Sequence, residues 1–80
     1  MLISKDSLLK ELGKRIVSIR KEKNLTQTDL AARVKKDQQS IQRLEKGNVN
    51  PSFYYLYEIA DGLEISIQEL INFEMPQKKK

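Results

Sequence analysis

The 80-residue sequence contains no cysteine and no histidine. Their absence excludes disulfides, thiolate chemistry, imidazole bases and the usual zinc sites, and with them most enzymatic mechanisms. No apolar run approaches the roughly 20 residues that a membrane-spanning helix needs. The start of the chain, MLISKDSLLKELG, also lacks the apolar core and cleavage site of a signal peptide. We therefore expect a cytoplasmic protein that is not an enzyme and that uses no metal or cofactor.

Basic residues are absent from one part of the chain and acidic residues are sparse in another. Residues 1–52 contain 12 Lys and Arg against 6 Asp and Glu, whereas residues 53–75 contain no Lys or Arg and 5 Asp and Glu. The first part is suited to polyanions, which the second part would avoid. A solvated charged surface is the simpler explanation, so this asymmetry does not decide the function.

Strand patterns are also lacking, because the apolar residues recur at intervals of three and four rather than two. The spacing predicts a single all-α domain over residues 1–75, followed by a basic disordered tail at residues 76–80. Its five helices are expected at about residues 5–23, 27–34, 38–46, 53–61 and 67–73. The residues expected to cap helix starts are Thr26, Asp37, Ser52 and Ser66.

Two of the predicted helices have a clear apolar stripe. In the first helix the expected stripe is Leu8, Leu12, Ile16 and Ile19, and in the fourth it is Phe53, Leu56, Ala60 and Leu63. These stripes are predicted to face the core.

The second and third predicted helices are short and only two or three residues apart, which favours a helix-turn-helix over a hairpin of long helices. Leu30 and Val34 in one helix, and Ile41 and Leu44 in the other, are spaced to face inward. The opposite side of the third helix has amides and cations without a carboxylate: Gln38, Gln39, Gln42, Arg43 and Lys46.

Such a face is suited to duplex DNA. Gln can bond adenine N6 and N7 together, Arg can bond guanine O6 and N7 together, and each good pair discriminates by about 1–3 kcal/mol. A soluble helix also needs a polar outer face, and on composition alone this alternative has equal weight. The place of Gln38 and Gln39 in the first turn favours DNA, because that end of a recognition helix points into the groove.

The segment LTQTDLAARVKKDQQSIQRLEKGNVNPS resembles the helix-turn-helix of the Cro/cI-like (XRE) family of bacterial and phage regulators, over roughly residues 12–73. The matching residues are Leu25, Thr26, Gln27, Leu30, Ala31, Ile41, Leu44, Glu45, Gly47, Asn50, Pro51 and Ser52. The QQSI run is similar to the recognition helices of lambdoid phage repressors. The resemblance implies a compact five-helix, lambda-repressor-like domain that reads an operator through its third helix.

The resemblance also implies roles for individual residues. Base edges would be read by Gln38, Gln39, Gln42 and Arg43. Phosphates would be bound by Gln27, Lys36, Lys46, Asn48 and the capped helix start at Phe53, where backbone amides and the helix dipole attract anions. Gln27 is also expected to brace Gln38. Arg20 and Glu45 are expected to form a structural ion pair between the first and third helices.

Two residues depart from the family pattern at the turn. Lys35 stands where the family usually has Gly, and an L-residue held in the left-handed conformation costs on the order of 1–2 kcal/mol. Lys36 stands where an apolar residue is usual and can bury only its stem. We expect either a different turn or a tolerated strain.

The aromatic run FYYLY has no Lys or Arg beside it, which disfavours a platform for stacking bases. Tyr54 or Tyr55 is expected to reach a phosphate. The last helix has more apolar residues than one face needs, and the surplus predicts a homodimer interface rather than simple closure of the core. The expected interface residues are Tyr57, Ile67, Ile71 and Phe73. A two-fold dimer predicts an inverted-repeat operator.

Several functions are compatible with these patterns. The leading one is a sequence-specific transcriptional regulator, a repressor, with double-stranded DNA as its partner. An antitoxin with a toxin partner, or the controller of a restriction-modification system, would use the same fold. A protein-binding adaptor without DNA contact is disfavoured by the intact donor face. An enzyme is least expected, because the sequence has no nucleophile-base constellation and no metal-ligand cluster.

Overall fold

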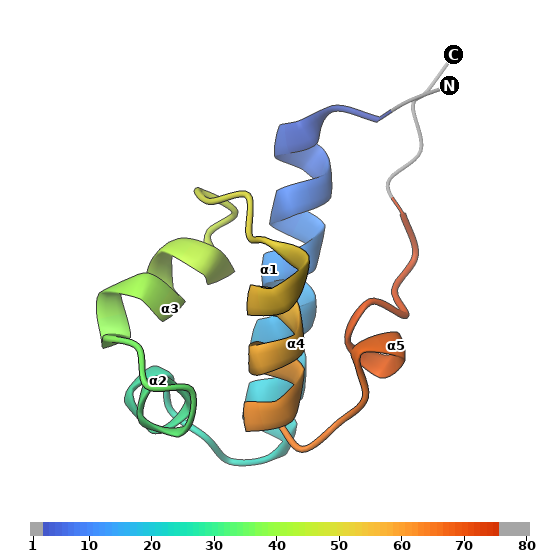
Figure 1. Cartoon of the computed structure of the whole chain (residues 1–80). Helices are drawn as coiled ribbons and strands as arrows, with labels where there is room; N and C mark the ends of the chain where they lie inside the picture. The colour runs from blue at the N-terminus through green and yellow to red at the C-terminus, as the bar shows by residue number, and fades with distance from the viewer. Residues whose placement is uncertain (1–2, 76–80) are drawn as a thin grey trace.

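The computed structural model describes residues 3–75 (Figure 1). Its helices are α1 (Lys5–Glu22), α2 (Gln27–Arg33), α3 (Gln38–Glu45), α4 (Phe53–Gly62) and α5 (Ile67–Leu70). The predicted all-α fold with five helices is confirmed. The last helix is shorter than expected, because it ends at Leu70 and not at residue 73. The tail predicted at residues 76–80 lies outside the described residues.

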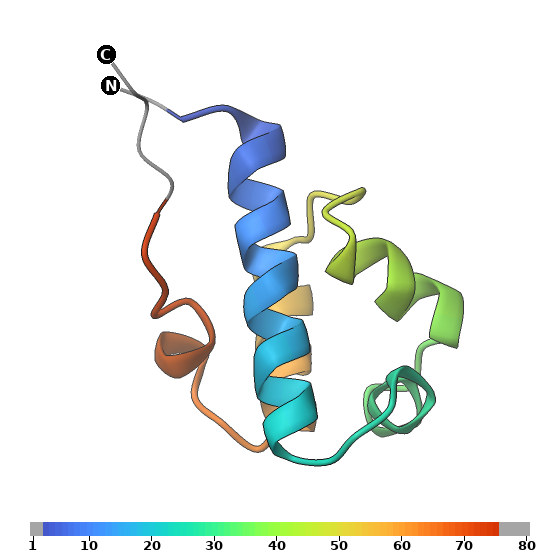
Figure 2. The same cartoon turned by 180° about the vertical axis from the view of Figure 1, so that it is seen from behind.

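The helices are arranged around α1 and α4. In two opposite views, α2 and α3 lie on one side of α1 and α4, and α5 lies on the other side (Figures 1 and 2). α3 contacts both α2 and α1, α2 contacts α4, and α4 contacts α5. Within residues 3–75, no helix is long and apolar enough to cross a bilayer.

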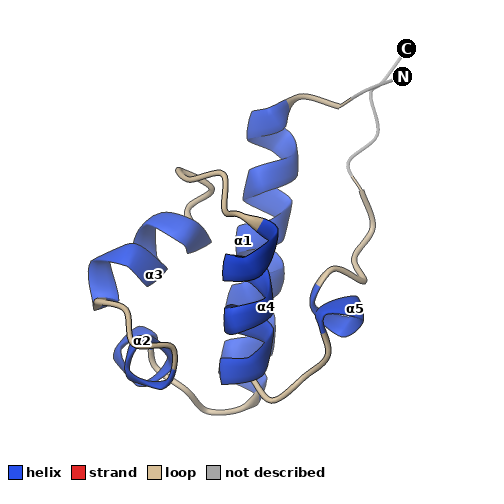
Figure 3. Cartoon of the chain, viewed as in Figure 1, coloured by secondary structure: helices blue, strands red, loops and turns tan. Residues whose placement is uncertain are grey.

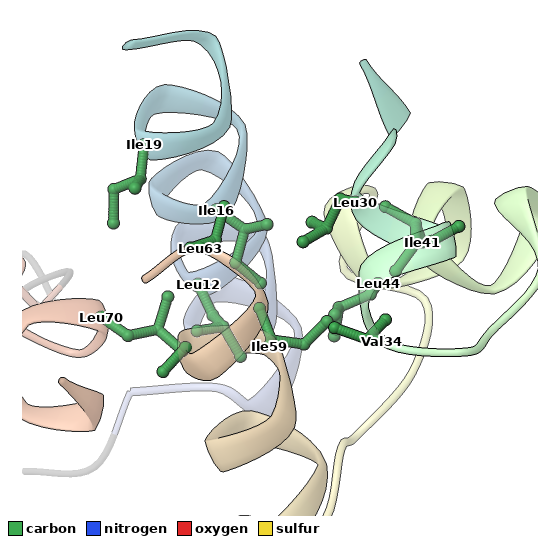
Figure 4. Packing of buried hydrophobic residues seen from close by; sticks show 12 residues of the cluster. Leu12, Ile16, Ile19, Leu30, Val34, Ile41, Leu44, Ile59, Leu63 and Leu70 are labelled. Atoms are coloured by element: carbon green, nitrogen blue, oxygen red, sulfur yellow. The ribbon is translucent and has the colours of Figure 1, made fainter. Parts of the chain in front are cut away.

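One hydrophobic core joins all five helices (Figure 4). Its fully buried large side chains are Ile16, Leu30, Ile41, Leu44, Ile59, Leu63 and Leu70. Burying a side chain of this size contributes about 1.5–3 kcal/mol. Since α3 inserts Ile41 and Leu44 into this core, packing fixes its position and orientation.

Two of the predicted core positions are wrong. Leu9, not Leu8, is the buried leucine at the start of α1, and Leu8 is only half-buried. Phe53 was expected to face inward but is 72% exposed. The buried face of α4 is centred on Ile59 and Leu63, which lie about a quarter of a turn or more around the helix from Phe53.

Four helices end in the same way, at the short connections drawn in tan in Figure 3. The positive φ angles are 58° at Asn24, 56° at Lys35, 77° at Gly47 and 60° at Glu64. After each of these residues, the next backbone N–H donates to a carbonyl five positions earlier at 3.0 Å. Lys35 therefore adopts the left-handed conformation for which the family uses Gly. The strain is tolerated and the turn keeps its usual closure.

Candidate nucleic-acid interface

α3 has a buried face and an exposed face. Ile41, Leu44 and Glu45 are buried, whereas Gln39, Arg43 and Lys46 are exposed and Gln38 and Gln42 are half-buried at the edge between the two faces. We call Gln39, Arg43 and Lys46 the outer face of α3. The residues expected to contact DNA from this helix thus share one continuous surface.

The residue that precedes α3 presents a carboxylate. Asp37 is the N-cap, and its side chain accepts a hydrogen bond from the Ser40 backbone N–H at 2.7 Å. The hydrogen bonds from Ser40 lower the pKa of the Asp37 carboxyl, so this group is ionised at neutral pH. The capping pattern identified Asp37, but sequence reasoning gave it no place at the interface. It is an acceptor beside the donors of the outer face.

Arg20 and Glu45 form a buried ion pair between α1 and α3. Arg20 Nε donates to Glu45 Oε2 at 2.6 Å and Arg20 Nη2 donates to Glu45 Oε1 at 3.0 Å. The third nitrogen, Nη1, donates to the Leu25 carbonyl at 2.9 Å. Arg20 is 8% exposed and Glu45 is 9% exposed. Such a bidentate pair is geometrically specific, and losing one partner would leave the other charge buried and unpaired.

Gln27, the first residue of α2, lies between Glu45 and Gln38. Its Nε2 donates to Glu45 Oε1 at 2.8 Å, and its Oε1 accepts from Gln38 Nε2. Gln27 therefore braces Gln38, as expected. Because its amide is engaged inside the protein, its backbone N–H is the better group for a phosphate.

The other residues expected to bind phosphates have different surroundings. The Nζ of Lys36 lies 5.3 Å from the centroid of the Tyr55 ring and 4.0 Å from Glu58 Oε1, so part of its charge is offset within the protein. Asn48 is exposed beside the end of α3, and Phe53 and Tyr54 are exposed at the start of α4. Tyr55, the alternative to Tyr54, is half-buried, and burial raises the pKa of its hydroxyl. Tyr54 is therefore the more accessible of the two.

Gly13 sets how closely α3 approaches α1. A Cβ atom at Gly13 would overlap the Glu45 carbonyl oxygen, which no side chain can do without displacing α3. Gly47 makes a similar approach, since its Cβ would lie 2.9 Å from the Cα of Lys10. Sequence reasoning missed Gly13. The available signal was a glycine inside an otherwise regular helical pattern.

Known proteins share this arrangement. The helix-turn-helix family model HTH_3 matches residues 16–70, which span the C-terminal part of α1 and all of α2 to α5. The chain belongs to this helix-turn-helix family. It is 40% identical over 62 residues to an uncharacterized HTH-type transcriptional regulator of Sinorhizobium fredii, covering 78% of this chain and 80% of that protein. It is 33% identical over 63 residues to the immunity repressor protein of Bacillus phage phi105, covering 79% of this chain and 44% of the repressor.

Two solved structures extend the similarity. The restriction-modification controller C.AhdI from Aeromonas hydrophila matches with a TM-score of 0.76 and 30% identity, over 79% of this chain and 96% of that one. The controller C.Esp1396I, solved as a tetramer with its natural 35 base-pair operator, matches with a TM-score of 0.70 and 33% identity, over 81% and 96%. The helix-turn-helix protein described here is a DNA-binding transcriptional regulator.

On this helix-turn-helix protein, the residues expected at a dimer interface differ in exposure. Tyr57 is 53% exposed and Ile71 is 41% exposed. Ile67 and Phe73 are half-buried and pack against the core of their own chain. The apolar surplus of the last helix is thus partly used within the chain, and Tyr57, Ile71 and Met75 remain exposed.

Proposed function

We propose that this regulator acts as a repressor, by occupying an operator that α3 reads in the major groove. The observation that supports this proposal is the outer face of α3, where three donor side chains are exposed together. The only carboxylate within α3, Glu45, is turned inward and neutralised by Arg20. A donor surface of this kind is complementary to the acceptors of the groove and to phosphates.

The residues divide into readers of sequence and residues that position the protein. The proposed base readers are Gln38, Gln39, Gln42 and Arg43. The proposed phosphate contacts are Lys36, Lys46, Asn48, the Tyr54 hydroxyl and the first backbone N–H groups of α2 and α4, at Gln27 and Phe53. The similarity to a phage immunity repressor supports repression. Occupying an operator needs no catalysis, and the protein would act in the cytoplasm, where bacterial and phage DNA lies.

We further propose that the protein binds DNA as a homodimer. Tyr57, Ile67, Ile71 and Phe73 would contribute to the interface, with the exposed Tyr57 and Ile71 contributing most. A two-fold axis would place two copies of α3 about 34–36 Å apart, one turn of DNA, so the operator would be an inverted repeat. Light scattering should give twice the chain mass, and Ile71→Glu should halve it; a monomeric wild-type protein would contradict the dimer.

Selection from random duplexes tests the function. The wild-type protein is mixed with random duplexes at about 50 mM salt, where phosphate contacts are strong, and bound duplexes are recovered and sequenced. An enriched inverted repeat is the expected result. The matched control is the double variant Gln39→Ala, Arg43→Ala, which should melt like the wild type but enrich no common sequence. Failure of the wild type to bind any duplex would overturn the proposal.

Control of a restriction-modification system is a second candidate, favoured by the similarity to two such controllers. It uses the same surface and differs in the genes that are regulated. Mapping the selected operator onto the genome separates the two roles. An operator beside a restriction endonuclease gene supports the controller, whereas operators at unrelated promoters support a general repressor.

A further inference from the structure

The first turns of α1 lie outside the segment that matches the family model. That match begins at residue 16, whereas α1 begins at Lys5. These turns lie beside residues 47–52, which connect α3 to α4 and which we call the α3–α4 loop (Figures 1 and 2). The contact is close, because a Cβ atom at Gly47 would lie 2.9 Å from the Cα and from the Cγ of Lys10. The first turns of α1 therefore pack on a loop that borders the DNA-facing surface.

A groove of about 280 Å³ lies between the first turns of α1 and the α3–α4 loop. It is lined by Lys5, Asp6 and Leu9 from α1 and by residues 47–50 from the loop. Asn48 and Asn50 in that range are exposed, as is Lys5. Their amide and ammonium N–H groups are donors, which suit a phosphate because its oxygens are acceptors. Asp6 is the only carboxylate among the described residues that line the groove.

Lys10 lies at the edge of this groove. Because its Cγ is so close to the place where Gly47 would have a Cβ atom, its side chain passes over Gly47 toward the α3–α4 loop. Within residues 3–75, neither Lys5 nor Lys10 has a carboxylate oxygen within 4.0 Å. Lys14, one turn further along α1, is instead paired with Glu11 at 3.2 Å. The groove thus has two ammonium groups that no nearby carboxylate neutralises in this part of the chain.

We propose that this groove is a further DNA-backbone site, in which Lys5 and Lys10 bind phosphates that α2, α3 and α4 do not reach. The inference rests on the proposed function, because it requires α3 to lie in the major groove. The DNA backbone would then cross the end of α3, where Asn48 is a proposed phosphate contact. Asn48 also lines the groove. Since each strand has one phosphate per about 3.4 Å of helix axis, side chains beside Asn48 meet the neighbouring phosphates.

Contacts of this kind have a measurable signature. They strengthen binding to every duplex and leave the preferred sequence unchanged, because phosphates carry no sequence information. Each phosphate that a lysine neutralises adds about 0.9 to the slope of log affinity against log salt. The two lysines together should therefore account for about two units of the wild-type slope.

Charge-removing and charge-keeping variants test the inference. Gln removes the charge of Lys but keeps a polar stem, so the variants are Lys10→Gln and the double variant Lys5→Gln, Lys10→Gln. The double variant Lys5→Arg, Lys10→Arg keeps both charges. Lys14→Gln is the matched control, because it removes one charge from the next turn of the same helix. Folding is checked by thermal melting, and affinity for the selected operator is measured from about 50 to 200 mM salt.

The Gln double variant should melt like the wild type, because both lysines are exposed, and it should select the same operator sequence. Its salt slope should be shallower than that of the wild type by about two units, and that of Lys10→Gln by about one. The Arg double variant and Lys14→Gln should keep the wild-type slope. If the Gln double variant does not fold, Lys5→Gln alone gives the comparison at one unit.

Ethylation interference locates the contacts on the DNA. Ethylating a phosphate removes its charge, so it weakens binding wherever the protein contacts that phosphate. The Gln double variant should become insensitive to ethylation at one or two phosphates in each half-site and keep the wild-type pattern elsewhere. A general effect of net protein charge would not single out particular phosphates.

The inference is overturned if the folded Gln double variant keeps the wild-type salt slope or the wild-type interference pattern. It is also overturned if Lys14→Gln changes the slope as much as Lys10→Gln does. These outcomes leave the proposed function standing, because the operator is still bound. A wild-type protein that binds no duplex would instead overturn the proposed function, and this inference with it.

Discussion

The inner face of α3 is expected to determine stability, whereas its outer face is expected to determine DNA binding. On the inner face, Ile41 and Leu44 fill the core, and Glu45 is bonded to Arg20 and lies against Gly13. On the outer face, Gln39, Arg43 and Lys46 are exposed, so they contribute little to folding. Changes to the inner face should therefore alter stability, and changes to the outer face should alter DNA binding alone. Gln38 is the exception, because it is half-buried and belongs to both.

Glu45→Ala should have the largest effect on stability. Removing the carboxylate leaves Arg20 charged and buried, which should lower the free energy of unfolding by about 3–5 kcal/mol. Urea denaturation measures the loss. The matched control is Glu64→Ala, because Glu64 forms an exposed pair with Arg33 at 3.3 Å and its loss should cost at most about 1 kcal/mol. Equal losses in the free energy of unfolding would contradict the claim that the buried ion pair matters more to stability than the exposed one.

Gly13→Ala should destabilise the protein by about 2–3 kcal/mol, because the added methyl group overpacks the contact with Glu45. Helix propensity alone predicts the opposite sign, a gain of about 1 kcal/mol. Thermal melting distinguishes the two signs. A raised melting temperature would show that the approach of α3 to α1 is not set by Gly13.

Gln39→Ala should leave the free energy of unfolding within about 0.5 kcal/mol of the wild type. It should weaken operator binding by about 1–3 kcal/mol and relax the preference at one base pair in each half-site. Fluorescence anisotropy with the selected operator measures the affinity. The control is Gln68→Ala, which should bind like the wild type. Gln68 is exposed on α5, and α5 lies on the opposite side of α1 and α4 from α3 (Figures 1 and 2). Loss of stability in Gln39→Ala would contradict the separation of the faces.

Lys46→Ala should weaken binding to all duplexes alike, because Lys46 is assigned to phosphates. The slope of log affinity against log salt should become shallower by about one unit. Lys14→Ala is the control, since Lys14 is on α1 and paired with Glu11 at 3.2 Å, and it should leave the slope unchanged. A change confined to one operator sequence would make Lys46 a base reader.

Lys35→Gly should give the smallest effect, a gain in stability of up to about 1 kcal/mol. The substitution relieves the left-handed strain, although part of the gain is lost to the greater freedom of Gly in the unfolded chain. Lys35→Ala removes the same side chain but keeps the strain, so it should show no such gain. Equal stability of the two variants would mean that the turn is not strained.

The sequence predicted the features that depend on local spacing. Five helices, the capped helix starts and the polar side of α3 follow from periodicity and capping residues. Periodicity predicts the centre of a buried face less well, because it puts Phe53 and Leu8 on the inner side, whereas Ile59 and Leu9 are the buried residues. The helix α5 was predicted too long because its apolar pattern continues to Phe73, which packs against the core from outside the helix.

Features formed by residues distant in sequence were harder to predict. The contact of Arg20 with Glu45 was expected only from the family resemblance, since 25 positions separate them. The close approach of Gly13 to Glu45 depends on how α1 and α3 cross. The hydrogen bonds of Gln27 join the start of α2 to the start of α3 at Gln38 and to the end of α3 at Glu45. No local sequence pattern encodes such an arrangement.

The most direct test of the account compares the wild type with a variant in which all three outer-face residues, Gln39, Arg43 and Lys46, are changed to Ala. Both proteins are titrated against the selected operator, and their melting curves are measured in the same buffer. We predict unchanged melting and a loss of affinity of at least about 100-fold. A variant that folds and still binds the operator as tightly as the wild type would show that α3 does not read DNA.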